Sequence, residues 1–143
     1  MSVKNKINSI NLWLKKNTSI NEQILSIKKF ETGQSNPTFL LKSDHKSFVL
    51  RSKPLGNLLR GAHRIDREYK VMSALSNSKI PTPKMYGYCS DGDIIGSEFY
   101  VMEFINGAHE FDPDLPNYTS EQRDKIYKHK IKILAELVKL NLK

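Results

Sequence analysis

Four short stretches of the 143-residue sequence carry residues that could hold a phosphate-bearing ligand. The first is a polar tetrapeptide between two apolar runs, Gly33, Gln34, Ser35 and Asn36. Glycine lets a backbone approach a ligand closely, and backbone N–H groups and small polar side chains can bind phosphate oxygens. We therefore expect these residues to form a phosphate loop at a hairpin tip, although an ordinary hairpin turn would use the same residue types.

The second stretch, Phe48-Val49-Leu50-Arg51, has the pattern of a buried strand that ends in a cation. Side chains alternate along a strand, so Val49 and Arg51 share one face. In the protein-kinase pattern Val-Ala-Ile-Lys, the basic residue contacts the α- and β-phosphates of ATP and pairs with a glutamate of the following helix. Val49 would then cover an adenine and Arg51 would reach a phosphate. Arginine is bulkier than lysine, so the sequence supports the ion pair more than the phosphate contact.

The third stretch is a helical pattern that contains Glu68, three residues after Ile65 and four before Met72. This spacing places the Glu68 carboxylate on the apolar stripe of the helix, where an unpaired charge is costly. Arg51 is the partner that the topology offers. A surface pair with Arg64, one helical turn earlier, is the alternative, and we favour Arg51.

The fourth stretch, "FYVMEFINGA", is an apolar strand that runs into a glycine-containing segment. It has the pattern of a kinase hinge, in which main-chain groups bind the edge of an adenine. The carbonyl of Glu103 and the N–H and carbonyl of Ile105 would make these bonds, and Met102 would fill the back of the pocket. Taken alone, the same strand could be plain core.

The elements that must position these residues follow from hydrophobic periodicity and turn residues. The pattern predicts a helix at 7–16, strands at 24–32, 37–42 and 47–51, a helix at 62–76, strands at 84–89 and 98–105, and a last helix starting at the capping-box pair Thr119 and Gln122. We therefore expect an α+β fold in which a helix is inserted after the third strand of a five-stranded antiparallel sheet.

The last predicted helix carries two adjoining apolar stripes, wider than a helix on a surface usually needs. Their residues are Ile126, Ile133, Leu137 and Leu140, and Tyr127, Ile131, Leu134 and Val138. Residues 106–117 contain prolines and a glycine, so they read as a linker that carries this helix away from the sheet. We expect part of the apolar surface to need another cover, either a further lobe or a second copy of the chain.

Composition limits the classes of function. A chain of this length with 38% hydrophobic and 27% charged residues is expected to form one compact unit. The formal charge of +8 comes from scattered basic residues with no nucleic-acid motif, so nucleic acid is not the expected partner. The absence of an apolar run of spanning length and the single cysteine, Cys89, lead us to expect a cytoplasmic protein. The four histidines lack metal-ligand spacing, so we expect each of them, His63 included, to be a surface residue rather than a metal ligand.

Together, "GQSNPTF", "FVLR", "REYKVMSAL" and "IIGSEFYVMEFINGA", in this order and at these distances, resemble the N-terminal part of the aminoglycoside-phosphotransferase-like (choline-kinase-like) family. The resemblance is to the branch related to the kinase domains of certain acyl-CoA dehydrogenase proteins, and it runs from about Lys29 to the end of the chain. It implies a protein-kinase-like small lobe at 1–105, a hinge at 106–117, and the first helix of a large lobe at 118–143.

The resemblance also implies transfer of a phosphoryl group from ATP or GTP, with Mg²⁺, to a hydroxyl of a small molecule. By this resemblance Arg51 is the strand-three basic residue, Glu68 its helix partner, and Glu103 to Ile105 the hinge. The family's catalytic loop and metal-binding residues lie in the large lobe, so we expect this chain to contain neither. We expect a fragment or one half of a split enzyme, whose partner would be a separate large-lobe polypeptide; a non-catalytic protein-interaction module that uses the last helix is the alternative.

Overall fold

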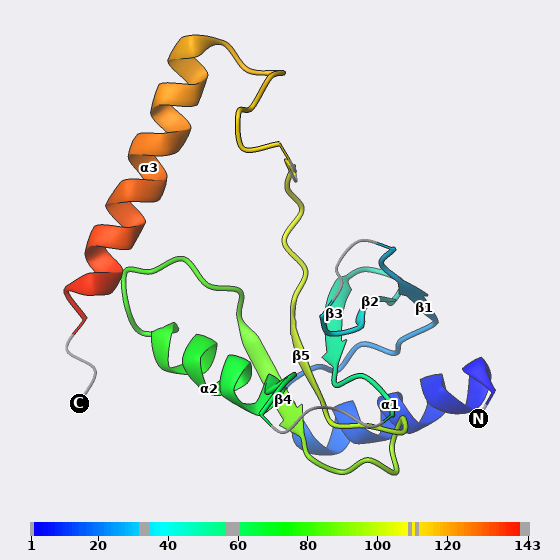
Figure 1. Cartoon of the computed structure of the whole chain (residues 1–143). Helices are drawn as coiled ribbons and strands as arrows, with labels where there is room; N and C mark the ends of the chain where they lie inside the picture. Colours follow the sequence, from blue (N-terminus) through cyan, green and yellow to red (C-terminus); the bar gives the residue numbers. More distant parts are fainter. Residues whose placement is uncertain (1, 32–34, 57–60, 109, 111, 141–143) are drawn as a thin grey trace.

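The structure is a computed structural model that describes residues 2–31, 35–56, 61–108, 110 and 112–140 (Figure 1). The elements of this part are α1 (Val3–Asn17), β1 (Ser26–Lys29), β2 (Thr38–Lys42), β3 (Ser47–Ser52), α2 (Ile65–Leu75), β4 (Met85–Cys89), β5 (Phe99–Glu103) and α3 (Ser120–Val138). The predicted order of elements is confirmed, although β1 and α2 are shorter than predicted. None of these helices combines the length and the apolar character needed to cross a membrane.

In the described residues, the five strands form one antiparallel sheet in the order β1-β2-β3-β5-β4. The first three strands form a meander, and α2 is inserted after the third strand, between β3 and β4, as predicted. β5 then returns to pair with β3, so that β3 lies at the centre of the sheet. The predicted α+β fold class is confirmed.

One face of the sheet is closed by α1 and forms the hydrophobic core. Ile10 and Leu14 of α1 are buried in one cluster with Leu50, Phe99 and Val101 of the central strands. They lie one helical turn apart, so they point to the same side of α1. The ring of Trp13 adds an edge-to-face contact with that of Phe99, with 4.9 Å between their centroids. The predicted first helix therefore packs against the sheet.

Two local features place α1 on this face. The side-chain amide of Asn11 donates to the carbonyl of Ile24 and accepts from its N–H group, at 2.9 and 2.8 Å, which ties the helix to the segment before β1. At Gly87 in β4, an added Cβ would lie only 3.0 Å from side-chain atoms of Trp13 and Thr18. A larger residue at position 87 would therefore require the side chains of Trp13 and Thr18 to shift by a few tenths of an ångström.

The helix α2 reaches the opposite face of the sheet. Its Tyr69 ring stacks on Tyr88 of β4, with 5.6 Å between centroids, and Ile65 is completely buried. Asp66 and Glu68 lie in the first turn, where negative charge favours a helix N-terminus. This packing holds Glu68 over the middle of the sheet.

The helix α3 stands away from the sheet at the end of the extended segment that follows β5 (Figure 1). The predicted capping box between Thr119 and Gln122 is present. Large apolar side chains of α3 are exposed to solvent, as predicted: Tyr127, Ile131, Leu134, Leu137 and Val138. What covers them stays a prediction.

The segment 106–117 differs in part from the featureless linker that the sequence predicts. Leu115 is buried, and its φ of 51° puts it in the left-handed region. The Arg123 guanidinium donates to the carbonyl of Asp114, and the Tyr127 hydroxyl donates to that of Pro113. The second half of the segment is thus attached to the start of α3. The functional division of the chain at this segment stays a prediction.

Candidate functional site

The predicted ion pair between Arg51 and Glu68 forms the centre of the site. Arg51 Nε lies 2.9 Å from Glu68 Oε2, with both side chains about one-third exposed. Arg51 comes from β3 and Glu68 from the first turn of α2, so the pair links the sheet to the helix. The alternative partner is wrong: Arg64 instead pairs with Asp66 at 2.7 Å, and this contact lowers the pKa of the Asp66 carboxyl.

Both oxygens of the Glu68 carboxylate are occupied. Oε2 accepts from Arg51 Nε and, at 3.0 Å, from the Tyr100 hydroxyl, while Oε1 accepts from Asn36 Nδ2 at 2.8 Å. Burial and then the negative charge of Glu68 raise the pKa of the Tyr100 hydroxyl, which therefore stays a donor at neutral pH. Three donors on one carboxylate compensate for its partial removal from water.

Arg51 keeps donors for a ligand. A guanidinium has five N–H groups. In the described residues, Arg51 uses one to reach Glu68 and one to reach Thr38 Oγ1 at 3.0 Å, which leaves three. A planar cation with free N–H groups and a fixed orientation suits a phosphate group.

Asn36 lies in the site, but not as a free residue at a hairpin tip. It is only 4% exposed, and its side chain connects Glu68 to His63, whose Nδ1 lies 3.0 Å from Asn36 Oδ1. Its side chain thus supports Glu68. Ser35 is exposed, whereas Gly33 and Gln34 lie outside the described residues. A phosphate-binding role for these four residues stays a prediction.

Sequence reasoning missed two members of this network and misjudged one of them. It took His63 for a surface residue, yet the structure places it against Asn36 with a φ of 56°. Tyr100 was read only as part of an apolar strand. Its position opposite Arg51 in the β3–β5 register could have identified it, because directly paired residues share a face.

An open cleft of about 560 Å³ lies beside the ion pair, on the α2 face of the sheet. Its lining residues come from β3, from α2 and its N-cap residue Arg64, and from β5: Arg51, Arg64, Arg67, Glu68, Val71, Met72, Tyr100 and Met102. The predicted common face of Val49 and Arg51 is confirmed by the register, since Val49 is opposite Met102 and Arg51 is opposite Tyr100. An apolar surface and a cation with free N–H groups thus lie side by side.

The predicted hinge residues lie at the end of β5. The N–H of Glu103 donates to the carbonyl of Lys84 at 2.8 Å, so this part of its backbone is held by the sheet. Ile105 lies beyond the strand with its side chain exposed, and its N–H and carbonyl have no hydrogen-bond partner within the part of the chain that the structure describes. These groups are available to a ligand.

The family model described as "Phosphotransferase enzyme family" (APH) matches residues 26–143. The chain belongs to this phosphotransferase family. The match begins at β1 and includes the whole sheet, so it contains every residue of the network around Glu68.

Curated relatives of this phosphotransferase chain are longer proteins. The chain is 45% identical to acyl-CoA dehydrogenase family member 11 of Homo sapiens over 121 residues, which are 85% of this chain and 16% of the relative. It is 44% identical to probable acyl-CoA dehydrogenase IBR3 of Arabidopsis thaliana over 122 residues, which are 82% of this chain and 15% of the relative. The chain thus spans about a sixth of the length of these relatives.

A solved structure from Ralstonia eutropha, described as a candidate aminoglycoside phosphotransferase, has the same fold. The TM-score is 0.79 with 34% sequence identity, over 94% of this chain and 38% of that chain. The predicted kinase-like fold is therefore confirmed, and the chain corresponds to less than half of the solved structure.

Proposed function

We propose that this chain is the nucleotide-binding lobe of a phosphotransferase that moves the γ-phosphoryl group of ATP or GTP to a hydroxyl of a small molecule. The observation that carries the proposal is the Arg51 guanidinium, which Glu68 orients beside an open cleft while three of its N–H groups stay unused in the described residues. A cation fixed in this way can bind a phosphate without first losing conformational entropy.

The described residues fit the two ends of a nucleotide. Met102, which lines the cleft opposite the buried Val49, offers an apolar surface for a base, and the main-chain groups of Ile105 offer a donor and an acceptor for its edge. Arg51 lies on the same face of the sheet as Val49 and Met102, where it would hold the α- and β-phosphates. The nucleotide supplies the phosphoryl group, and these residues bind and orient it.

The same residues do not fit a metal ion. Glu68 provides the only carboxylate that lines the cleft in the described part of the chain, and both of its oxygens already accept hydrogen bonds from donors. Mg²⁺ takes oxygen ligands and is commonly held through carboxylates and phosphates. We therefore place the Mg²⁺ ligands and the catalytic loop in a second lobe outside these 143 residues, in the same polypeptide or in a separate one.

Titration of the isotope-labelled chain with ATP, followed by NMR, tests this assignment. We expect weak binding, with a dissociation constant no tighter than high micromolar, because one wall of the cleft belongs to the other lobe. Backbone signals of Arg51, Met102 and Ile105 should shift, and Arg51→Ala should weaken binding about tenfold. Calorimetry with Mg-ATP should give the same affinity, and no phosphate should be released.

Lys53→Ala is the matched control. The Lys53–Glu98 pair has side-chain exposures of 35% and 31%, close to the 28% and 36% of Arg51 and Glu68, but it lies outside the cleft. Both substitutions remove one positive charge and one ion pair. If the two variants lose the same affinity, the effect is one of net charge and the proposed role of Arg51 is wrong.

A second candidate function is a protein-interaction module. The exposed apolar side chains of α3 favour it, because such a surface needs a cover, either a large-lobe polypeptide or a second copy of this chain. Leu134 and Leu137 should therefore be replaceable by glutamine with a gain in solubility and an unchanged sheet. Light scattering should show loss of self-association. A chain that is monomeric at high concentration and unfolds on this double change would instead make α3 part of a self-sufficient fold.

A further inference from the structure

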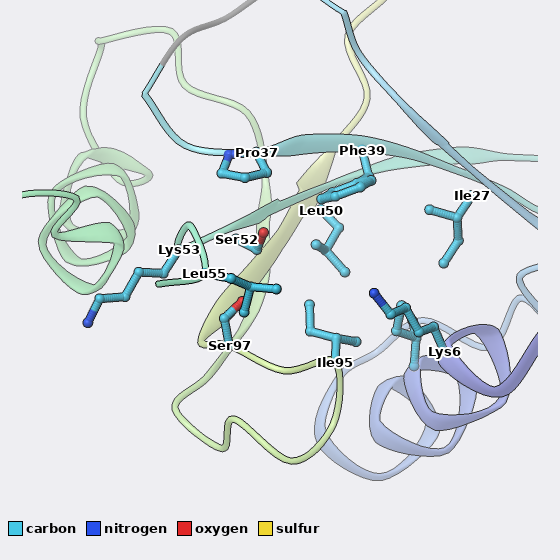
Figure 2. A pocket seen from close by; sticks show the side chains of 11 residues that line it. Lys6, Ile27, Pro37, Phe39, Leu50, Ser52, Lys53, Leu55, Ile95 and Ser97 are labelled. Carbon is cyan, nitrogen blue, oxygen red and sulfur yellow. The ribbon is translucent and has the colours of Figure 1, made fainter. Parts of the chain in front are cut away.

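A second cavity lies on the other face of the sheet, between α1, the strands β2 and β3, and the loop before β5 (Figure 2). Its volume is about 120 Å³. Phe39 and Leu50 of its wall are direct partners in the β2–β3 register and share the face that α1 covers. The thickness of the sheet therefore separates this cavity from the Arg51 cleft, and the proposed nucleotide site makes no use of it.

The walls of this cavity, which we call the α1-side cavity, are mainly apolar. Figure 2 shows the side chains of Phe39, Leu50, Leu55 and Ile95 around it, with Ile27 at the far end of the row. Leu50 is 1% exposed, so part of the wall belongs to the folded core. An apolar cavity of this kind favours an apolar occupant over water.

A cation lies at one end of the α1-side cavity. The ammonium of Lys6, from the first part of α1, is turned toward the apolar side chains in Figure 2. Within the residues that the structure describes, no carboxylate lies within ion-pair distance of Lys6, whereas the neighbouring Lys53 pairs with Glu98 at 3.3 Å. A half-buried cation beside apolar walls gains most from an anion that the ligand itself brings.

A buried polar group lies at the other end. Ser52 is only 4% exposed, lies on the same strand face as Leu50, and lines the cavity together with Ser97. In the described chain, the Ser52 hydroxyl makes no hydrogen bond, although its N–H bonds the carbonyl of Pro37. The Ser52 hydroxyl is not fully enclosed, unlike Ser73 Oγ, so it stays accessible to a hydrogen-bonding group of a ligand in the cavity.

We propose that the α1-side cavity binds a compact apolar carboxylate, with the carboxylate on Lys6 and the opposite end of the molecule against Ser52. The volume of about 120 Å³ is somewhat below that of a cavity of about 150 Å³ that binds benzene, so it limits the apolar part to at most one ring or a short branched chain. The apolar part packs against Phe39, Leu50 and Ile95. Binding is reversible and involves no covalent step.

Titration of the isotope-labelled 143-residue chain with benzoate tests the proposal, with benzamide as a neutral probe of the same shape. Benzoate at millimolar concentration should shift the backbone signals of Leu50, Ser52 and Ile95, and benzamide should bind about tenfold more weakly. Lys6→Gln should lower the affinity for benzoate to that for benzamide and leave benzamide binding unchanged. Ser97→Leu, which fills the cavity from its rim, should abolish the binding of both probes.

Lys4→Gln is the matched control, because Lys4 lies on the same helix, is exposed and does not line the cavity. It should leave benzoate binding unchanged. Equal losses in the Lys4 and Lys6 variants, shifts confined to the Arg51 face, or no shift at millimolar benzoate would each overturn the proposal. Arg51→Ala should not affect benzoate binding, so the outcome is independent of the proposed nucleotide site.

Discussion

Leu50 and Arg51 are neighbours in β3, yet they face opposite sides of the sheet and meet opposite surroundings. Leu50 is 1% exposed and packs in the cluster that α1 closes, whereas Arg51 meets polar groups of α2, β2 and β5 beside an open cleft. The alternation of a strand makes this possible, because each residue belongs to only one face. A single strand thus contributes to the core through one face and to the proposed nucleotide site through the other.

The difference also concerns what holds each face together. On the α1 side, ring and aliphatic side chains such as Phe99 and Val101 are fully buried. On the α2 side, Glu68 is held by three donors and remains partly exposed. Apolar burial stabilises roughly in proportion to area, whereas a half-exposed ion pair adds little. We therefore expect the α1 face to dominate stability and the α2 face to dominate ligand binding.

The largest effect is expected for Phe99→Ala on the α1 face. Phe99 is completely buried and contacts Trp13, so the substitution leaves a cavity in the core. It should lower the free energy of unfolding by about 3–5 kcal/mol, measured by urea denaturation. A loss below about 1 kcal/mol would show that this face does not dominate stability.

A smaller effect is expected for Glu68→Ala on the α2 face. It removes the acceptor of Arg51, Asn36 and Tyr100, but these donors can partly turn to water, so the loss of unfolding free energy should be about 1–2 kcal/mol. The free energy of nucleotide binding should fall by more than the free energy of unfolding, because Arg51 loses the group that orients it. Glu68→Gln, which keeps the shape, serves as the control. If Glu68→Ala lowers the free energy of unfolding as much as Phe99→Ala does, the α1 face does not dominate stability.

The pH dependence of the free energy of unfolding should distinguish the hydrogen-bond network around Glu68 from the apolar core. The pKa of Tyr100 is raised, so its neutral form is favoured by folding; the resulting stability is present below the unfolded pKa of about 10 and is lost as the pH rises above it. Ultraviolet titration should show the Tyr100 phenol ionising later than free tyrosine. In Tyr100→Phe the stability should decline less steeply above that pH. An unchanged alkaline profile in this variant would contradict the buried hydrogen bond to Glu68.

The smallest effect is expected for Lys53→Ala, which removes the other ion pair of similar exposure. Lys53 and Glu98 lie 3.3 Å apart and about one-third exposed, so the loss of unfolding free energy should be below about 1 kcal/mol. Urea denaturation of the Lys53→Ala and Glu68→Ala variants under the same conditions compares the two losses of unfolding free energy directly. Equal losses in the two variants would indicate that the network around Glu68 adds nothing beyond a surface pair.

Most of the fold could be predicted from local pattern. The short apolar runs of β2 and β3, the turn residues between strands and the capping box at Thr119 are local signals, and each element appears where the pattern places it. The ends of elements were less predictable. The first strand is shorter than its apolar run, because Ile24 instead bonds the side chain of Asn11 in α1. Such a contact depends on a residue 13 positions away and leaves no local signal.

The sequence by itself determined the order of the elements, the face of β3 that carries Arg51, and the need of Glu68 for a cation, since alternation, periodicity and the cost of an unpaired charge are properties of short stretches. Only the tertiary structure decided which groups share Glu68. Asn36 and Tyr100 meet at Glu68, and His63 reaches Asn36, because β5 pairs with β3 and α2 packs on β4 and β5. The α1-side cavity has the same origin, because Lys6 and Ser52 line one cavity only when α1 lies on the sheet.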